Sequence, residues 1–135
     1  MFTYLTVALF SFISLFHLYL GLGGRINSDY ILPKINGKPF PFHSLAALPV
    51  AILLTLSTIA FAHDVGLTGP LMYSILWEKY LWLTGIALVI RGGIGLLVFH
   101  ALGRVIDPGH FKTWDFRLYS PLCIYLGTHC LIVLQ

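Results

Sequence analysis

The sequence predicts an all-α integral membrane protein whose single domain is a bundle of four transmembrane helices. Of its 135 residues, 58% are hydrophobic and only 10% are charged, whereas about 25% of the residues in an ordinary soluble domain are charged. So few charges cannot cover a folded domain with polar surface, and lipid is therefore the expected solvent. The apolar residues also form four long runs, and the connectors between these runs hold most of the charges.

The boundaries of the predicted helices follow from these runs, which cover residues 2–22, 45–62, 80–102 and 118–134. The first run lacks the basic segment that begins a signal peptide, so we expect it to be a helix of the bundle. Ser44 is the predicted N-cap of the second helix. Ser120 and Pro121 are the predicted N-cap and first residue of the fourth helix, which makes that span short.

Basic residues are unevenly shared between the two sides of the predicted bundle. Four spans place both termini and the second connector on one side, and the first and third connectors on the other. The side with the second connector holds one basic residue, Lys79. The opposite side holds six, which are Arg25, Lys34, Lys38, Arg104, Lys112 and Arg117. Because cytoplasmic loops are rich in Lys and Arg, connectors one and three are predicted to be cytoplasmic and both termini outside.

One charged residue, Arg91, lies inside the third predicted helix. At about 1.5 Å per residue it is ~16 Å from Tyr80 along the helix, close to the middle of a hydrocarbon core about 30 Å thick. A charge at that depth costs roughly 2.5–3.5 kcal/mol and usually faces a partner inside the bundle. Asp115 or Tyr119 is the predicted partner, with Arg117 competing for Asp115. The alternative is that Arg91 reaches the nearer interface or forms a purely structural pair.

The predicted topology brings several polar side chains to the cytoplasmic half of the bundle. We expect them to line a ligand-binding pocket there, formed by His17, Arg91, His100, Asp115 and Tyr119.

Cofactor sites are weakly indicated, and we predict no cofactor, no metal ion and no catalytic residue. His17 and His100 could face each other as axial haem ligands, but neither has a companion at ligand spacing. A zinc site formed by His63, Asp64 and His129 is similarly weak. The sequence contains no nucleophile elbow, Walker loop, HExxH or CxxC motif. The net charge of +3 is spread over the connectors and does not indicate nucleic-acid binding.

Several local patterns resemble a known family of small bacterial membrane proteins, domain of unknown function 3995. They are HLYLGLGGR at 17–25, LPKINGKPFPF at 32–42, the mid-helix Arg91 and DFRLYSPLC at 115–123. The stretch YSPLC is the most specific of them, whereas Leu20 stands where that family often has tryptophan. The resemblance implies four helices in a bacterial cytoplasmic membrane and no established activity.

Three functions remain open. The first is an accessory or partner-binding subunit of a larger membrane complex, or a protective membrane protein, whose partners are the bilayer and other subunits or copies of itself. The second is binding or transport of an anionic or quinone-like ligand at the pocket around Arg91. The third is a membrane enzyme that uses His17 as a base oriented by Asp115.

Overall fold

The part of the chain that the structure describes is helical apart from one very short β-ladder. The computed structural model describes residues 2–25, 34–35, 38–39, 44–67, 74–101 and 109–133. The helices within this part of the chain are α1 (Phe2–Gly21), α3 (Ala47–Asp64), α4 (Ser74–Ala101), α5 (Gly109–Trp114) and α6 (Ser120–Ile132). A π-helical turn, η2 (Asp115–Tyr119), joins α5 to α6, and a 3-10 turn, η1 (Ser44–Ala46), precedes α3. The strands β1 (Lys34–Ile35) and β2 (Lys38–Pro39) pair antiparallel.

The helices pack as two hairpins, α1 against α3 and α4 against α6. Small residues allow α4 and α6 to approach closely, because a Cβ atom added at Gly85 would lie 2.9 Å from the carbonyl oxygen of Gly127. In the other hairpin, the Ser14 hydroxyl donates a hydrogen bond of 3.0 Å to the carbonyl oxygen of Ala51. Close backbone approach and interhelical hydrogen bonds are the usual means by which helices associate in lipid.

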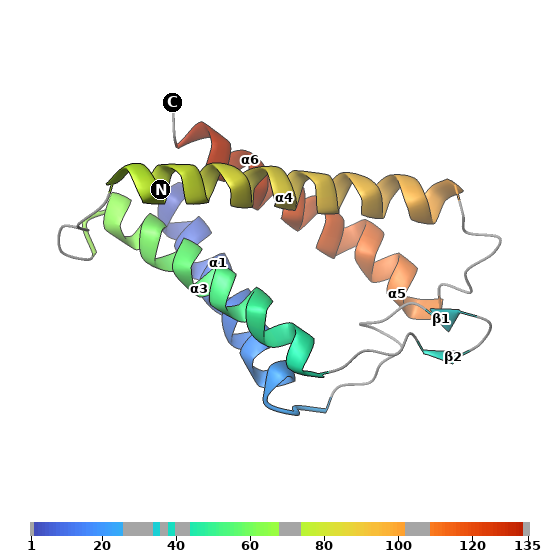
Figure 1. The fold of residues 1–135 in the computed structure, drawn as a ribbon. Helices are drawn as coiled ribbons and strands as arrows, with labels where there is room; N and C mark the ends of the chain where they lie inside the picture. Colours follow the sequence, from blue (N-terminus) through green and yellow to red (C-terminus); the bar gives the residue numbers. More distant parts are fainter. Residues whose placement is uncertain are drawn as a thin grey trace.

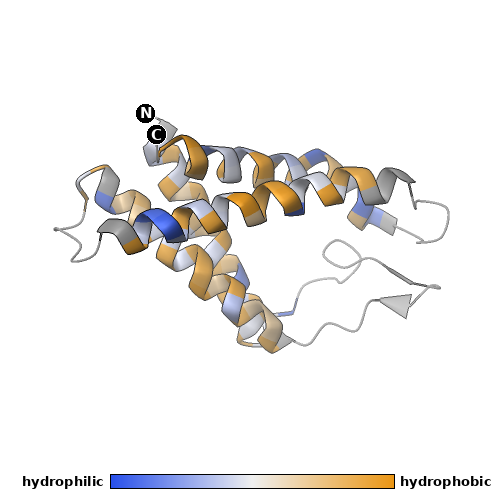
Figure 2. Ribbon diagram, turned by 45° about the horizontal axis from the view of Figure 1, so that its top comes forward, coloured by the Kyte–Doolittle hydropathy of each residue, from blue (hydrophilic) through white to orange (hydrophobic). Residues whose placement is uncertain are grey.

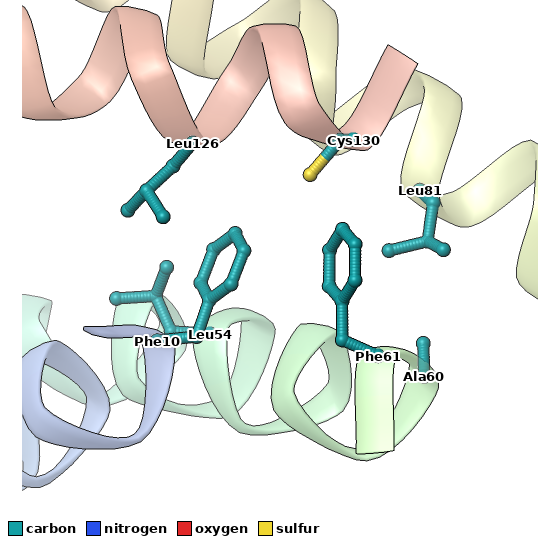
Figure 3. Close-up of a cluster of buried hydrophobic side chains, with 7 residues drawn as sticks. All are labelled: Phe10, Leu54, Ala60, Phe61, Leu81, Leu126 and Cys130. Atoms are coloured by element: carbon teal, nitrogen blue, oxygen red, sulfur yellow. The ribbon is translucent and has the colours of Figure 1, made fainter. Parts of the chain in front are cut away.

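The two hairpins meet at one end and diverge toward the other, which gives the molecule the shape of a V (Figures 1 and 2). Where they meet, side chains from all four long helices form a buried apolar cluster (Figure 3). At its centre the rings of Phe10 and Phe61 stack with their centroids 5.6 Å apart. The other members of this end cluster are Leu54, Ala60, Leu81, Leu126 and Cys130.

Hydrogen bonds between the hairpins accompany the end cluster, among them one in which the hydroxyl groups of Ser57 on α3 and Tyr80 on α4 lie 3.2 Å apart. The Tyr80 hydroxyl on α4 donates to the carbonyl oxygen of Leu53 on α3. The hydroxyl groups of Thr6 on α1 and Tyr125 on α6 lie 3.5 Å apart. The first and last described residues also lie at this end of the molecule (Figure 1).

The helix boundaries in the structure differ from the predicted ones, most of all at the fourth helix. The first predicted helix, 2–22, corresponds to Phe2–Gly21, and the second begins at Ala47 after a 3-10 turn rather than at an N-cap Ser44. The third begins at Ser74 instead of residue 80. The fourth was predicted to begin at residue 118, but the chain is helical from Gly109, so Ser120 and Pro121 lie inside a longer helix.

Among the described residues, two helices are long and apolar enough to cross a bilayer, at Thr3–Gly21 and Leu76–Leu97. The apolar stretch Ala47–His63 in α3 is shorter. Apolar residues cover much of the helix surface (Figure 2), and large side chains such as Phe12 and Leu97 are 70% and 72% exposed. A surface of this kind suits hydrocarbon better than water.

Candidate functional site

An ion pair between Arg91 on α4 and Asp115 in the π turn is the centre of the candidate site. The Nη2 atom of Arg91 lies 2.6 Å from Oδ1 of Asp115. The two partners differ sharply in exposure, because the Asp115 side chain is fully buried and that of Arg91 is 46% exposed. Asp115 is one of the two partners that the sequence predicts for Arg91.

Ser120 on α6 is the second hydrogen-bond partner of the buried carboxylate. Its hydroxyl donates a hydrogen bond of 2.8 Å to Oδ2 of Asp115, and the Ser120 side chain is itself buried. Each carboxylate oxygen of Asp115 therefore accepts one hydrogen bond, one of them from a cation. A buried carboxylate is tolerated only when it is paired and hydrogen-bonded in this way. We call Arg91, Asp115 and Ser120 the polar triad.

Glycines on α4 bring this helix close enough to form the polar triad. A Cβ atom added at Gly95 would lie 2.6 Å from Oδ2 of Asp115 and 2.7 Å from Nη1 of Arg91, and it would also collide with the Ser120 hydroxyl. At Gly92 the same atom would lie 2.7 Å from the carbonyl oxygen of Ser120. At Gly92 the backbone of α6 comes close, whereas at Gly95 the nearest atoms are the side chains of the polar triad. Gly93 differs, because nothing lies within 4 Å of its added Cβ.

The π turn has a local cause in the sequence. Pro121 has no N–H group, and in a regular α-helix its ring would clash with the carbonyl group four residues earlier. Immediately before it, the Ser120 N–H donates to the carbonyl oxygen of Asp115, five residues back, which is the hydrogen bond of a π turn. The wider turn lets the helix continue through the proline, and it is also where the buried carboxylate is placed.

Arg91 lies on the face of α4 that looks toward the other hairpin. Trp77 and Leu88 on this helix pack against the end cluster. Arg91 follows Leu88 by three residues and Trp77 by two heptads, and residues at such spacings share one face of a helix. These spacings put Arg91 on the same face of α4 as Trp77 and Leu88, C-terminal to Leu81 of the end cluster, and its guanidinium group is half exposed.

Of the other predicted pocket residues, Tyr119 lies close enough to feel the charge of Asp115, whereas no side-chain contact within the described structure joins His17 to the ion pair. Tyr119 lies within the π turn, and its ring centroid is 6.3 Å from that of Phe111. His17 lies on α1 in the other hairpin, where its Nδ1 atom is 2.8 Å from the carbonyl oxygen of Ile13. It follows Phe10 by seven residues and so also shares the inner face of its hairpin. His100 is in the last turn of α4, but its side chain lies outside the described part of the structure.

Sequence reasoning missed Ser120 as a member of the site. The pattern Ser-Pro normally marks the start of a helix, which assigned Ser120 to a capping role. The spacing of five residues between Asp115 and Ser120 was the available signal, because a π turn places residues i and i+5 next to each other.

No group of three or more possible metal ligands occurs among the residues that the structure describes. The weak zinc alternative of His63, Asp64 and His129 involves Asp64, whose side chain is not described. The haem alternative pairs His17 with His100, whose side chain is also outside the described part.

Comparison with known protein families gives a match over residues 10–130 to the family described as protein of unknown function (DUF3995). No curated protein and no solved structure matches the chain.

Proposed function

Since the chain belongs to the DUF3995 family, whose description assigns no activity, we propose a function from its geometry. The protein is a multi-pass membrane protein that binds an anionic amphiphile between its two hairpins, with Arg91 as the group that holds the anion. The observation that carries this proposal is the half-exposed guanidinium group on the inner face of α4, anchored by a fully buried Asp115.

Three features support four membrane crossings. Two helices have the length of a span, α3 adds a shorter apolar stretch, and the helical segment from α5 to α6 runs without a break from Gly109 to Ile132. The first and last described residues lie at the same end of the molecule, as an even number of crossings requires. The basic connectors then lie together on the opposite side, which places them in the cytoplasm and both termini outside a bacterial inner membrane.

This topology predicts which positions a membrane-impermeant reagent can reach. In a background with Cys123 and Cys130 replaced by alanine, Lys79→Cys should react with an impermeant maleimide added to intact cells. Lys38→Cys should react only after the inner membrane is permeabilised. Labelling of both positions in intact cells, or of neither, would contradict four crossings with the termini outside.

Anion binding needs a cation that is still available for a ligand. Within the described part of the chain, the only side-chain partner of Arg91 is Asp115, which takes one of the five N–H donors of a guanidinium group. The side chain of Arg91 is also 46% exposed, and we expect an amphiphile to reach it from the side on which the hairpins diverge (Figure 1). A charged side chain in the middle of a membrane span raises the free energy of inserting the helix, and such a side chain is typically part of a ligand or ion site.

The variant Arg91→Leu should lose anionic amphiphiles that copurify with the protein from its membrane, as measured by lipid extraction and mass spectrometry. Because this change leaves Asp115 buried without its cation, the double variant Arg91→Leu/Asp115→Leu provides a form with no unpaired charge. Arg117→Leu is the matched control, since it removes an exposed cation from the same region. If the double variant keeps the full complement of anionic amphiphile, the proposal is wrong.

A second candidate is an accessory subunit that binds other membrane proteins or its own copies. The outward position of Gly93 favours it, because its surroundings are open and the exposed side chains of Ile90, Ile94 and Leu97 flank it. A small residue among large apolar ones is a common contact site for a second helix. Native mass spectrometry after mild extraction tests this candidate, and a monomer under all conditions would contradict it.

The third hypothesis, an enzyme in which Asp115 orients His17 as a base, gains no support from the described contacts. Both carboxylate oxygens of Asp115 are engaged by Arg91 and Ser120. The Nδ1 atom of His17 is engaged by the carbonyl oxygen of Ile13.

A further inference from the structure

We infer that the anionic group recognised at Arg91 is a single carboxylate carried on an apolar chain, in other words a fatty-acid-like monocarboxylate. This inference rests on the proposed function, because it names the chemical class of the ligand at the same site. It follows from the geometry of one guanidinium group, from the buried charge behind it and from the apolar side chains beside it.

The first step concerns the shape of the available donor. Arg91 uses Nη2 for Asp115, and its other described environment is open enough to leave the side chain 46% exposed. A planar guanidinium group that is anchored at one position can present a second pair of parallel N–H donors. Two parallel donors match two oxygens of a carboxylate or of a phosphate, which are the common bidentate pairings of arginine, so the choice between the two rests on charge.

The second step concerns charge. Asp115 is fully buried and paired directly with Arg91, so the formal charges of the pair cancel. A ligand with one negative charge adds to a neutral site, whereas a second negative charge would lie close to the Asp115 carboxylate and be repelled by it. Within the described structure, no contact joins another Lys or Arg side chain to the pair. Phosphate head groups with two charges usually require several cations or a helix N-terminus.

The third step concerns the remainder of the ligand. Leu88 on α4, Leu122 on α6 and Ile13 on α1 are partly buried and pack against the end cluster. Leu88 is one helical turn from Arg91 on the same face, so an apolar wall begins directly beside the guanidinium group. A long hydrocarbon chain fits this wall and the surrounding lipid, whereas a small water-soluble carboxylate would gain nothing from either. The occupant that combines these features is a long-chain monocarboxylate.

Competition against a fluorescent fatty acid tests this inference on the purified full-length protein in a neutral detergent. cis-Parinaric acid serves as the probe, and the competitors are laurate, methyl laurate, dodecyl phosphate and phosphatidylglycerol. The measurement is made at about pH 9, where a phosphate monoester carries two charges. We expect laurate to displace the probe at a concentration at least about tenfold lower than methyl laurate or dodecyl phosphate requires, a preference worth about 1.4 kcal/mol.

Variants connect this preference to the named residues. Arg91→Leu/Asp115→Leu should lose probe binding, and Arg91→Lys should weaken it because an ammonium group cannot form the bidentate pair. Asp115→Asn should remove the repulsion, so that dodecyl phosphate competes as well as laurate. Arg117→Leu is the control and should bind the probe like the unaltered protein. Lys112→Gln should also bind normally, since an equal loss in this variant would mean that a cluster of basic residues holds the anion.

The outcomes separate this inference from the function on which it rests. Suppose that phosphatidylglycerol or dodecyl phosphate displaces the probe at concentrations equal to or below those of laurate, and that the double variant loses probe binding. Arg91 would then still be an anion site, but the inference that its ligand is a carboxylate would be wrong. Equal displacement by laurate and methyl laurate, or a double variant that binds the probe unchanged, would overturn both.

Discussion

At the scale of single residues, the chain solves the problem of a cation inside an apolar helix by pairing it with a buried carboxylate. The sequence is sufficient to predict that Arg91 needs a partner and that Asp115 is a candidate. It is not sufficient to predict Ser120, because that role depends on a π turn created by the proline that follows. It also leaves open the exposure of Arg91, which depends on how far the hairpins diverge.

A double-mutant cycle on Arg91 and Asp115 should reveal strong coupling. Each single change to leucine leaves a charged partner in an apolar environment, so each should lower the free energy of unfolding by roughly 2–4 kcal/mol. The double change removes both charges and should cost less than the sum, with a coupling energy of about 1–3 kcal/mol. Thermal unfolding in detergent gives all four values. Additive effects would mean that the 2.6 Å contact contributes little.

At the scale of secondary-structure elements, the last helix differs most from its prediction. Two glycines, one proline and three basic residues between positions 103 and 117 are typical of a connector, and they predict a short span that begins after it. The structure is helical from Gly109 because the π turn accommodates Pro121 within the helix. Local preference alone predicts that a helix starts at Ser-Pro. The π turn also packs against Gly92 and Gly95 of α4, and this tertiary packing is not visible to a prediction from local preference.

The contrast between Gly95 and Gly93 tests how tightly α4 packs on the π turn. Gly95→Ala places a methyl group against all three members of the polar triad and should destabilise the protein by about 1–3 kcal/mol. Gly93→Ala meets open space and should be neutral or stabilising by up to about 1 kcal/mol, because alanine favours the helix. Unfolding midpoints of the two variants in one detergent give the comparison. Equal midpoints would contradict the close approach at Gly95.

At the scale of the whole molecule, the two hairpins are joined chiefly through the end cluster and its accompanying hydrogen bonds. The sequence predicts four apolar segments in a membrane. It gives no means of predicting that α1 pairs with α3 and α4 with α6 while the hairpins diverge. That arrangement depends on side chains of all four helices meeting at one level.

Phe61→Ala should therefore weaken the packing between the two hairpins more than the packing within either hairpin. Phe61 is fully buried and stacks on Phe10, so its removal leaves a cavity that should cost about 3 kcal/mol or more. Phe12→Ala is the control, because that ring is 70% exposed on the same helix as Phe10. Thermal unfolding measures the loss, and limited proteolysis shows whether the hairpins separate. Equal loss in both variants would mean that the end cluster does not hold them together.

The contact between Tyr80 and the main chain of Leu53 lies beside the end cluster, far from the open ends of the hairpins. It is therefore near the point about which one hairpin could tilt relative to the other. A tilt of one hairpin about this contact would displace the far ends of the helices more than the side chains of the end cluster. The open end of the V is therefore where the separation of the hairpins would change most.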